Sequence, residues 1–231
     1  MGDCIVREVI SMNFKQAHYT NYRVGRTKPI QFIVIHYTAN NGDTAKNNVD
    51  YYSREGNLSA SAHYFVSENE VWQSVKDTDT AWHCGGNKYV HKTCRNDNSI
   101  GIELCSRKDA TGKYYFEYEV VKRAAALTKE LMKKYNIPIT NVIRHYDVTG
   151  KICPAPMVKE EKQWEEFLAM LSTPTKKLES GNDIIWELMN GKHKVEIKEV
   201  SKAVKALDKA KNDPEYLSLY WILYKVVNGN G

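Results

Sequence analysis

Strand-like and helix-like patterns alternate over the first 171 residues of the chain. A run of apolar residues at positions 31–35 is typical of a buried strand, and positions 99–105 predict a second one. Two β-type runs, at positions 62–67 and 71–75, flank a polar turn formed by Glu68 and Asn69. This arrangement predicts a β-hairpin.

Three segments have the pattern of helices, at positions 44–55, 120–135 and 160–171, with apolar residues at helical spacing. The middle segment stops shortly before Pro138, where a helix is expected to end. Strands interleaved with helices are typical of a sheet with helices packed on it. We therefore predict an α/β fold with a central mixed β-sheet flanked by helices.

The pattern changes near residue 175. Positions 172–177 form a short polar segment that contains Pro174, and positions 180–183 have the capping-box pattern that opens a helix at 184–189. Two further helical stretches follow, around positions 200–210 and 214–227. We therefore expect a domain at 1–171, a linker at 172–177 and a small all-helical C-terminal domain at 178–231.

Composition and charge fit a globular protein, with 42% hydrophobic and 26% charged residues among 231. The net charge of +5 suits contact with an anionic surface, but no basic run is dense enough to predict nucleic-acid binding. No apolar stretch approaches the length of a membrane span, so we expect no membrane insertion. The N-terminal residues lack the apolar region of a signal peptide, which predicts synthesis and initial retention in the cytoplasm. In that compartment the five cysteines are expected to be reduced thiols.

Three separated residues carry the candidate chemistry. His36 comes directly after an apolar strand, and His145 and Cys153 bracket a short loop. Two imidazoles and a thiolate suit zinc, and three protein ligands leave the fourth tetrahedral position open, as in catalytic sites. Taken singly, each residue has a plainer interpretation, as a surface or hydrogen-bonded histidine or as a small buried cysteine. Spacing alone does not decide between these interpretations.

Five short sequence blocks in a fixed order favour the interpretation of these residues as zinc ligands. They are IVIHYT at 33–38, SAHYFV at 61–66, TAWHCG at 80–85, NSIGIE at 98–103, and RHYD at 144–147 closed by KICP at 151–154. Together they resemble the type-2 N-acetylmuramoyl-L-alanine amidase superfamily, which includes the phage T7-type lysozyme and the animal peptidoglycan-recognition proteins. The resemblance spans about residues 30–160.

The resemblance implies a role for each matched position. Zinc (Zn2+) is expected on His36, His145 and Cys153. Glu103 matches an acid beside the metal that can take the proton of the attacking water and return it to the leaving amine. Lys151 matches a residue that can stabilise the oxyanion of the tetrahedral intermediate.

Four further residues are candidates for substrate binding. Trp82 and His83 would line the groove, where an aromatic face and an imidazole can hold sugar or stem peptide; the alternative for Trp82 is a place in the core. The other two candidates are His63 and Tyr64. Family members often have a tyrosine just before the histidine of the second block, where this chain has Ala62. Because Ala62 and Tyr64 would share one face of a strand, Tyr64 could point near the site. Whether it replaces the missing phenol stays open.

The implied function is hydrolysis of the amide bond between N-acetylmuramic acid and L-alanine in bacterial peptidoglycan, by an endolysin or autolysin of a Gram-positive phage or prophage. Such an enzyme acts on the cell wall after release. The tail segments ESGNDIIW at 179–186 and SLYW at 218–221 resemble the helical wall-binding domains of amidase endolysins.

Two alternative functions belong to protein classes other than zinc amidases. One is a non-catalytic peptidoglycan-recognition module, although such binders typically lack the cysteine ligand that Cys153 provides here. The other is a cysteine hydrolase that uses Cys153 and His145. It is disfavoured because Pro154 follows the thiol and no helix N-terminus is evident there to activate it. The oligomeric state cannot be predicted from the sequence.

Overall fold

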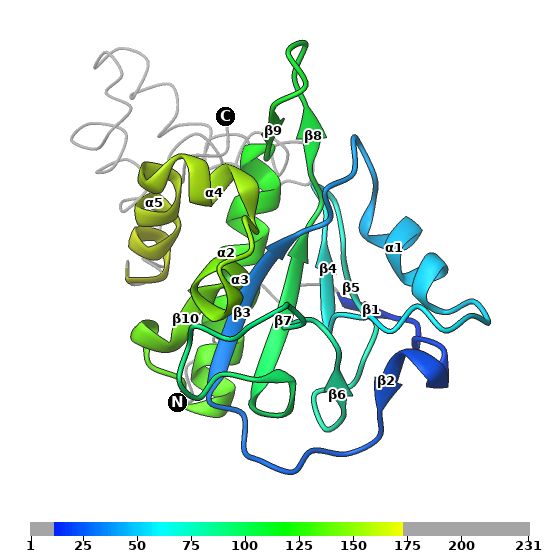
Figure 1. The fold of residues 1–231 in the computed structure, drawn as a ribbon. Coiled ribbons are helices and arrows are strands. Elements are labelled where there is room, and N and C mark those ends of the chain that lie inside the picture. Colours follow the sequence, from blue (N-terminus) through cyan, green and yellow to red (C-terminus); the bar gives the residue numbers. More distant parts are fainter. Residues whose placement is uncertain (1–11, 173–231) are drawn as a thin grey trace, which may run out of the picture. The chain divides into compact units, whose positions relative to one another are not determined.

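A computed structural model of the protein describes residues 12–172 (Figure 1). The predicted helical domain at 178–231 and nearly all of the predicted linker at 172–177 lie outside the described residues. The first eleven residues, which include Cys4, also lie outside them.

One six-stranded sheet forms the centre of the described region, in the order β1-β5-β4-β7-β3-β10 (Figure 1). Only β4 and β5 pair antiparallel, and the other neighbours run parallel. The strands are β1 (Met12–Phe14), β5 (Val71–Gln73), β4 (Tyr64–Val66), β7 (Ser99–Leu104), β3 (Phe32–Tyr37) and β10 (Val142–Arg144). The predicted mixed sheet and the predicted hairpin are therefore confirmed.

The three helices predicted at 44–55, 120–135 and 160–171 are present, as α1 (Ala45–Tyr52), α2 (Tyr118–Tyr135) and α5 (Glu161–Ser172). Helix α1 begins where the Thr44 side chain accepts a hydrogen bond from the Asn47 backbone N–H, which satisfies a free donor of the first turn. Helix α2 ends at Asn136, whose left-handed conformation (φ 52°) is typical of a residue that terminates a helix.

Several short elements were not predicted. Two five-residue helices, α3 (His145–Thr149) and α4 (Ala155–Lys159), are too short to show a helical repeat of apolar residues. Two small antiparallel ladders pair β2 (Tyr22–Arg23) with β6 (Thr80–Ala81) and β8 (Arg107–Lys108) with β9 (Tyr114–Tyr115). Three 3-10 turns complete the set, η1 (Tyr19–Asn21), η2 (Asn96–Asn98) and η3 (Ile139–Asn141).

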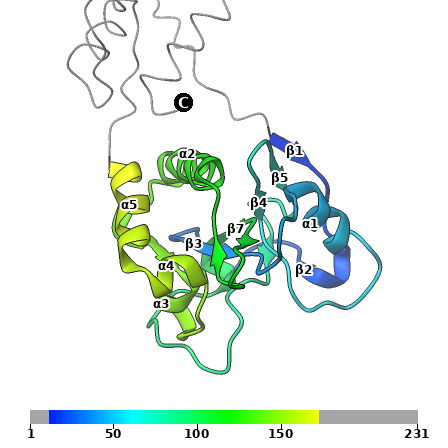
Figure 2. The same cartoon turned by 90° about the horizontal axis from the view of Figure 1, so that it is seen from above.

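One face of the sheet is apolar and packs against α2 and α5, which lie beside each other on that face in Figure 2. Ile33 and Ile35 of β3 and Ile102 of β7 point to this side, where they join the main core with Leu127 of α2 and Phe167 of α5. These side chains are almost completely removed from water, so their burial is the main source of stability for this layer. We call this side the helix face.

The opposite face of the sheet carries polar groups in its central strands. Because paired residues of parallel strands point to the same side, the register places Phe32 beside Ser99, Val34 beside Gly101 and His36 beside Glu103. Buried Cys84 and Cys94 pack on Phe32 and Val34, so the segment at 82–98 covers part of this side. We call it the histidine face.

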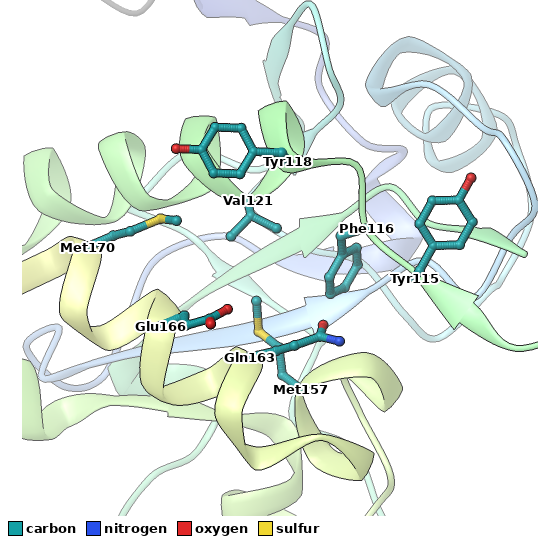
Figure 3. A pocket seen from close by; sticks show the side chains of 8 residues that line it. All are labelled: Tyr115, Phe116, Tyr118, Val121, Met157, Gln163, Glu166 and Met170. Carbon is teal, nitrogen blue, oxygen red and sulfur yellow. The ribbon is translucent and has the colours of Figure 1, made fainter. Parts of the chain in front are cut away.

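A cavity of about 320 Å³ lies on the helix side of the sheet, between α2, α4, α5 and β9 (Figure 3). Its lining includes Phe116, Val121, Met157 and Met170, and none of the candidate site residues lines it. Within residues 12–172, no helix is long and apolar enough to cross a membrane.

Candidate metal centre and active site

His36, His145 and Cys153 meet at one edge of the sheet. One possible ligand atom from each lies within 4.8 Å of the others, and all three side chains are buried. His36 Nδ1 lies 3.7 Å from the Cys153 sulfur, and the rings of His36 and His145 are 4.7 Å apart between centroids. The structure therefore brings together the three predicted ligands in a group that could hold a metal ion.

Strand register explains how the two histidines meet. Strands β3 and β10 run parallel, and Ile35 pairs with Arg144. His36 and His145 each follow that pair by one residue, so they leave neighbouring strands at the same edge. The two histidines are far apart in the sequence, and the pairing of β3 with β10 brings them together.

A tight turn of the chain brings Cys153 close to the two histidines. Helix α3 ends at Gly150 in a left-handed conformation (φ 80°), which a glycine adopts without steric cost. The chain then returns, and the Tyr146 backbone N–H donates to the Cys153 carbonyl at 2.8 Å. The thiol is therefore held directly beside the start of α3, next to His145.

Burial sets the protonation states of the three side chains. Burial, followed by the neighbouring His145, holds the pKa of His36 well below its usual value. Burial and the charge of Lys151 lower the pKa of His145 to about 4, so both imidazoles are neutral at pH 7. Burial and Glu103 raise the pKa of the Cys153 thiol to about 12. Neutral imidazoles are ready to bind a metal, whereas the thiol would lose its proton only when a cation binds.

The donor set fits zinc. Two imidazole nitrogens and one sulfur match the ligand types of zinc sites, and three protein ligands match the catalytic class, which keeps one position open. Glu103 supplies a second sign, because its Oε2 is buried and has no hydrogen-bond partner within residues 12–172. A buried carboxylate oxygen without a partner is costly unless a proton or a cation compensates it.

Glu103 and Lys151 are both close to this group. Glu103 pairs with His36 across β7 and β3, and burial raises the pKa of its carboxyl group to about 8, against the opposing effect of Lys151. Lys151 is exposed and lies in the loop between α3 and Cys153. Its positive charge acts on the pKa values of His36, His145 and Glu103, which places it within electrostatic reach of all three.

The predicted substrate-binding histidines are buried. His63 is fully inaccessible to solvent, accepts a hydrogen bond from the Gly101 backbone at Nδ1 (3.0 Å), and has its Nε2 2.6 Å from the Arg26 guanidinium. His83 is 7% exposed, and its Nδ1 lies 3.0 Å from His36 Nε2. Both rings are therefore almost completely enclosed in this structure, and a role for either of them in substrate binding stays a prediction. Trp82 keeps part of its surface exposed.

Tyr64 lies on the opposite side of the sheet from this group. It pairs with Ile102 and belongs to the core of the helix face. Its hydroxyl donates to Asp77 Oδ1 at 2.6 Å. The expectation that it points to the site rested on strand alternation from Ala62, but β4 begins only at Tyr64. Tyr64 therefore packs in the core of the helix face, and its part in substrate binding stays a prediction.

Sequence reasoning missed two neighbours of the site. Tyr37 directly follows His36, and its ring contacts Tyr114 of β9 edge-on at 5.3 Å. The Gly85 carbonyl lies 3.0 Å from His145 Nε2. The aromatic pair could have been suspected from Tyr37 in the first block, but a backbone carbonyl leaves no signal in a sequence.

One premise about Cys153 was wrong. A short helix, α4, does begin two residues after it, at Ala155. The raised pKa of the thiol still opposes a cysteine nucleophile, because the reactive species is the thiolate.

Comparison with known proteins identifies the family. A family model described as N-acetylmuramoyl-L-alanine amidase matches residues 26–156, which is more than half of the chain. The chain is 36% identical over 146 residues to the N-acetylmuramoyl-L-alanine amidase CwlL of Bacillus licheniformis, covering 60% of this chain and 39% of that protein. It is 35% identical over 147 residues to the amidase BlyA of Bacillus subtilis, covering 58% and 39%.

A solved structure supports the same relationship. The structure of PlyL aligns with a TM-score of 0.59 and 28% identity, over 70% of this chain and 97% of that one. The chain spans only about two fifths of the length of the curated relatives named above. With the family model covering more than half of its residues, the chain belongs to the N-acetylmuramoyl-L-alanine amidase family.

Proposed function

We propose that the protein is a zinc-dependent N-acetylmuramoyl-L-alanine amidase that cuts the bond between N-acetylmuramic acid and L-alanine in peptidoglycan. One observation carries the proposal: the donor atoms of His36, His145 and Cys153 lie within 4.8 Å of one another, with Glu103 in register beside His36. Membership of the amidase family supports the substrate class.

The three ligands and two further residues would divide the work. His36, His145 and Cys153 would hold a zinc ion, which would supply Lewis-acid activation of a water and of the amide carbonyl. Glu103, whose pKa burial raises to about 8, would ionise at neutral pH beside such a positive charge. The Glu103 carboxylate can then act as a general base.

Hydrolysis then requires two proton transfers and the stabilisation of one negative charge. Glu103 accepts a proton from the attacking water, whose oxygen bonds to the lactyl carbonyl carbon. The Lys151 ammonium stabilises the negative charge that develops on the carbonyl oxygen. Glu103 returns the proton to the nitrogen as the carbon–nitrogen bond breaks, which releases the amine of L-alanine.

The direct test is to find which bond is cut. Purified Gram-positive peptidoglycan is incubated with the protein, and the soluble fragments are identified by mass spectrometry. The proposal predicts free L-alanine amino termini and muramic acid with a free lactyl carboxyl group. Glu103→Gln, which keeps the size of the side chain, should release neither. Binding to the wall without new termini would support a recognition module instead, and new reducing sugars would indicate a glycosidase.

We also propose that residues 178–231 bind the wall and that the substrate is a Gram-positive cell wall reached after release from the cell. The support is the tail motifs at 179–186 and 218–221 and the Bacillus origin of several relatives. A fluorescent protein fused to residues 178–231 should sediment with Gram-positive walls, as an unfused reporter should not. A fusion that stays in the supernatant with every wall tested would remove this assignment.

A further inference from the structure

The segment His83–Gly85 contacts both histidines of the metal group. His83 reaches His36 through its side chain, and Gly85 reaches His145 through its carbonyl. The backbone of the segment is itself fixed, because the N–H groups of His83 and Cys84 both donate to Asn96 Oδ1, at 3.0 and 2.7 Å. Both proposed ligands therefore contact a segment whose backbone is held in place by hydrogen bonds.

Packing also fixes the His83 ring. The ring lies against Gly101 of β7, where an added Cβ would come within 2.6 Å of the His83 Cγ. Real Cβ atoms do not approach so closely, so the position next to the ring admits only glycine without a shift. Gly101 is on the same strand face as Glu103, two residues away. The ring therefore fills a defined space in the histidine face.

Hydrogen bonds define which nitrogen of His83 carries the proton. The Ser99 hydroxyl donates to the Arg95 carbonyl at 2.7 Å, so its oxygen can accept from His83 Nε2–H at 3.2 Å. A neutral imidazole has one proton, so His83 Nδ1 is left as an acceptor. That nitrogen can accept from His36 Nε2–H at 3.0 Å and from the Cys84 thiol at 3.2 Å.

The same reasoning fixes both metal-facing nitrogens. With its proton on Nε2, His36 presents the lone pair of Nδ1, the atom that lies 3.7 Å from the Cys153 sulfur. His145 can donate from Nε2 to the Gly85 carbonyl at 3.0 Å, which leaves its own Nδ1 without a proton. Both imidazoles are thus held in the tautomer that offers Nδ1 as a ligand.

We propose that His83–Gly85 is a positioning segment that fixes the tautomer and orientation of both histidine ligands, and that His83 is the positioning residue for His36. The inference rests on the proposed zinc site. It gives His83 a role other than the substrate contact expected from the sequence. Partners of this kind orient a metal ligand, and their loss typically weakens metal binding about 10- to 100-fold.

Zinc affinity of the full-length protein tests this without measuring activity. Metal-free protein competes with a chromogenic chelator for zinc, and the variants are wild type, His83→Ala, His83→Asn, Ser99→Ala and His36→Ala. His83→Ala should bind zinc about 10- to 100-fold more weakly than wild type. His83→Asn keeps an acceptor oxygen near the place of Nδ1 and should recover most of the affinity. Ser99→Ala leaves the ring in place but frees its tautomer, so a smaller loss of several-fold is expected.

Two controls separate positioning from packing. His91→Ala removes a histidine of the same covering segment whose Nδ1 accepts only from the backbone of Thr93 and Cys94, and it should bind zinc like wild type. Thermal unfolding of each metal-free variant reports the loss of packing. Co2+ substituted for zinc should give a different ligand-field spectrum in His83→Ala but not in His91→Ala.

The outcomes are distinct. Wild-type affinity and an unchanged Co2+ spectrum in His83→Ala would overturn the inference while leaving the zinc site intact. Equal losses in His83→Asn and His83→Ala, at equal thermal stability, would overturn it as well. If wild type binds no zinc and matches His36→Ala, the proposed zinc site fails, and this inference fails with it.

Discussion

The two faces of the central sheet are built from the same strands but in opposite ways. On the helix face, Ile33, Ile35 and Ile102 pack against α2 and α5 and contribute no polar side-chain atoms. On the histidine face, His36, Gly101 and Glu103 of the same two strands lie among buried imidazoles and thiols. Along β3 and β7, residues of the main core therefore alternate with residues of the histidine face, where His36 and Glu103 belong to the site.

The difference shows what each face tolerates. Apolar packing is non-directional, so a core side chain can be exchanged for another of similar volume at small cost. A buried imidazole needs a partner for each ring nitrogen, and losing one partner leaves a polar atom unsatisfied. We therefore expect substitutions on the helix face to lower stability and those on the histidine face to lower zinc binding or turnover.

The largest expected effect is on the histidine face. Glu103→Gln removes the general base, which should lower turnover of purified peptidoglycan by about 100- to 10,000-fold. The amide has nearly the same volume, so the zinc content and the unfolding temperature should stay close to those of wild type. Turnover is measured from released amino termini at saturating wall. Turnover within threefold of wild type would mean that Glu103 is not the base.

The matching change on the helix face is Leu127→Ala in α2. Leu127 is 1% exposed and belongs to the main core, so its truncation should cost about 2–5 kcal/mol in the free energy of unfolding. Chemical unfolding measures this loss. Zinc content and turnover per folded molecule should remain near wild type well below the unfolding temperature. A large loss of turnover with normal stability would show that the two faces are not separable.

The smallest expected effect concerns Tyr64, a candidate for substrate binding that packs in the core of the helix face. Tyr64→Phe removes a hydrogen bond to Asp77, which also accepts from Lys134 and Tyr135. Because those partners remain, we expect a loss of about 1 kcal/mol in stability and no change in turnover. A tenfold loss of turnover at equal stability would restore Tyr64 to the active site.

Much of the helix face could be predicted from the sequence. The apolar run before His36 and the helical repeat at 120–135 predicted β3 and α2, because a buried strand and an amphipathic helix each leave a local pattern of apolar residues. Helices α3 and α4 could not be predicted in this way, because five residues do not show a period.

The site was harder to derive. His36, His145 and Cys153 were identified only through a resemblance, since their contact depends on the register of β3 with β10 and on the reversal at Gly150. The buried state of His63 and His83 depends on tertiary packing that no local pattern reports. The Gly85 carbonyl is backbone, so its contact with His145 is invisible in any sequence.

We propose that the histidine face holds one zinc ion on which hydrolysis depends. The most direct measurement is a zinc titration of metal-stripped protein, followed by release of amino termini from purified peptidoglycan at each point. We expect no release without metal, a linear rise in release up to one zinc per chain, a plateau beyond that point, and no recovery in His36→Ala. Full release by the metal-stripped protein, or equal recovery in His36→Ala, would contradict it.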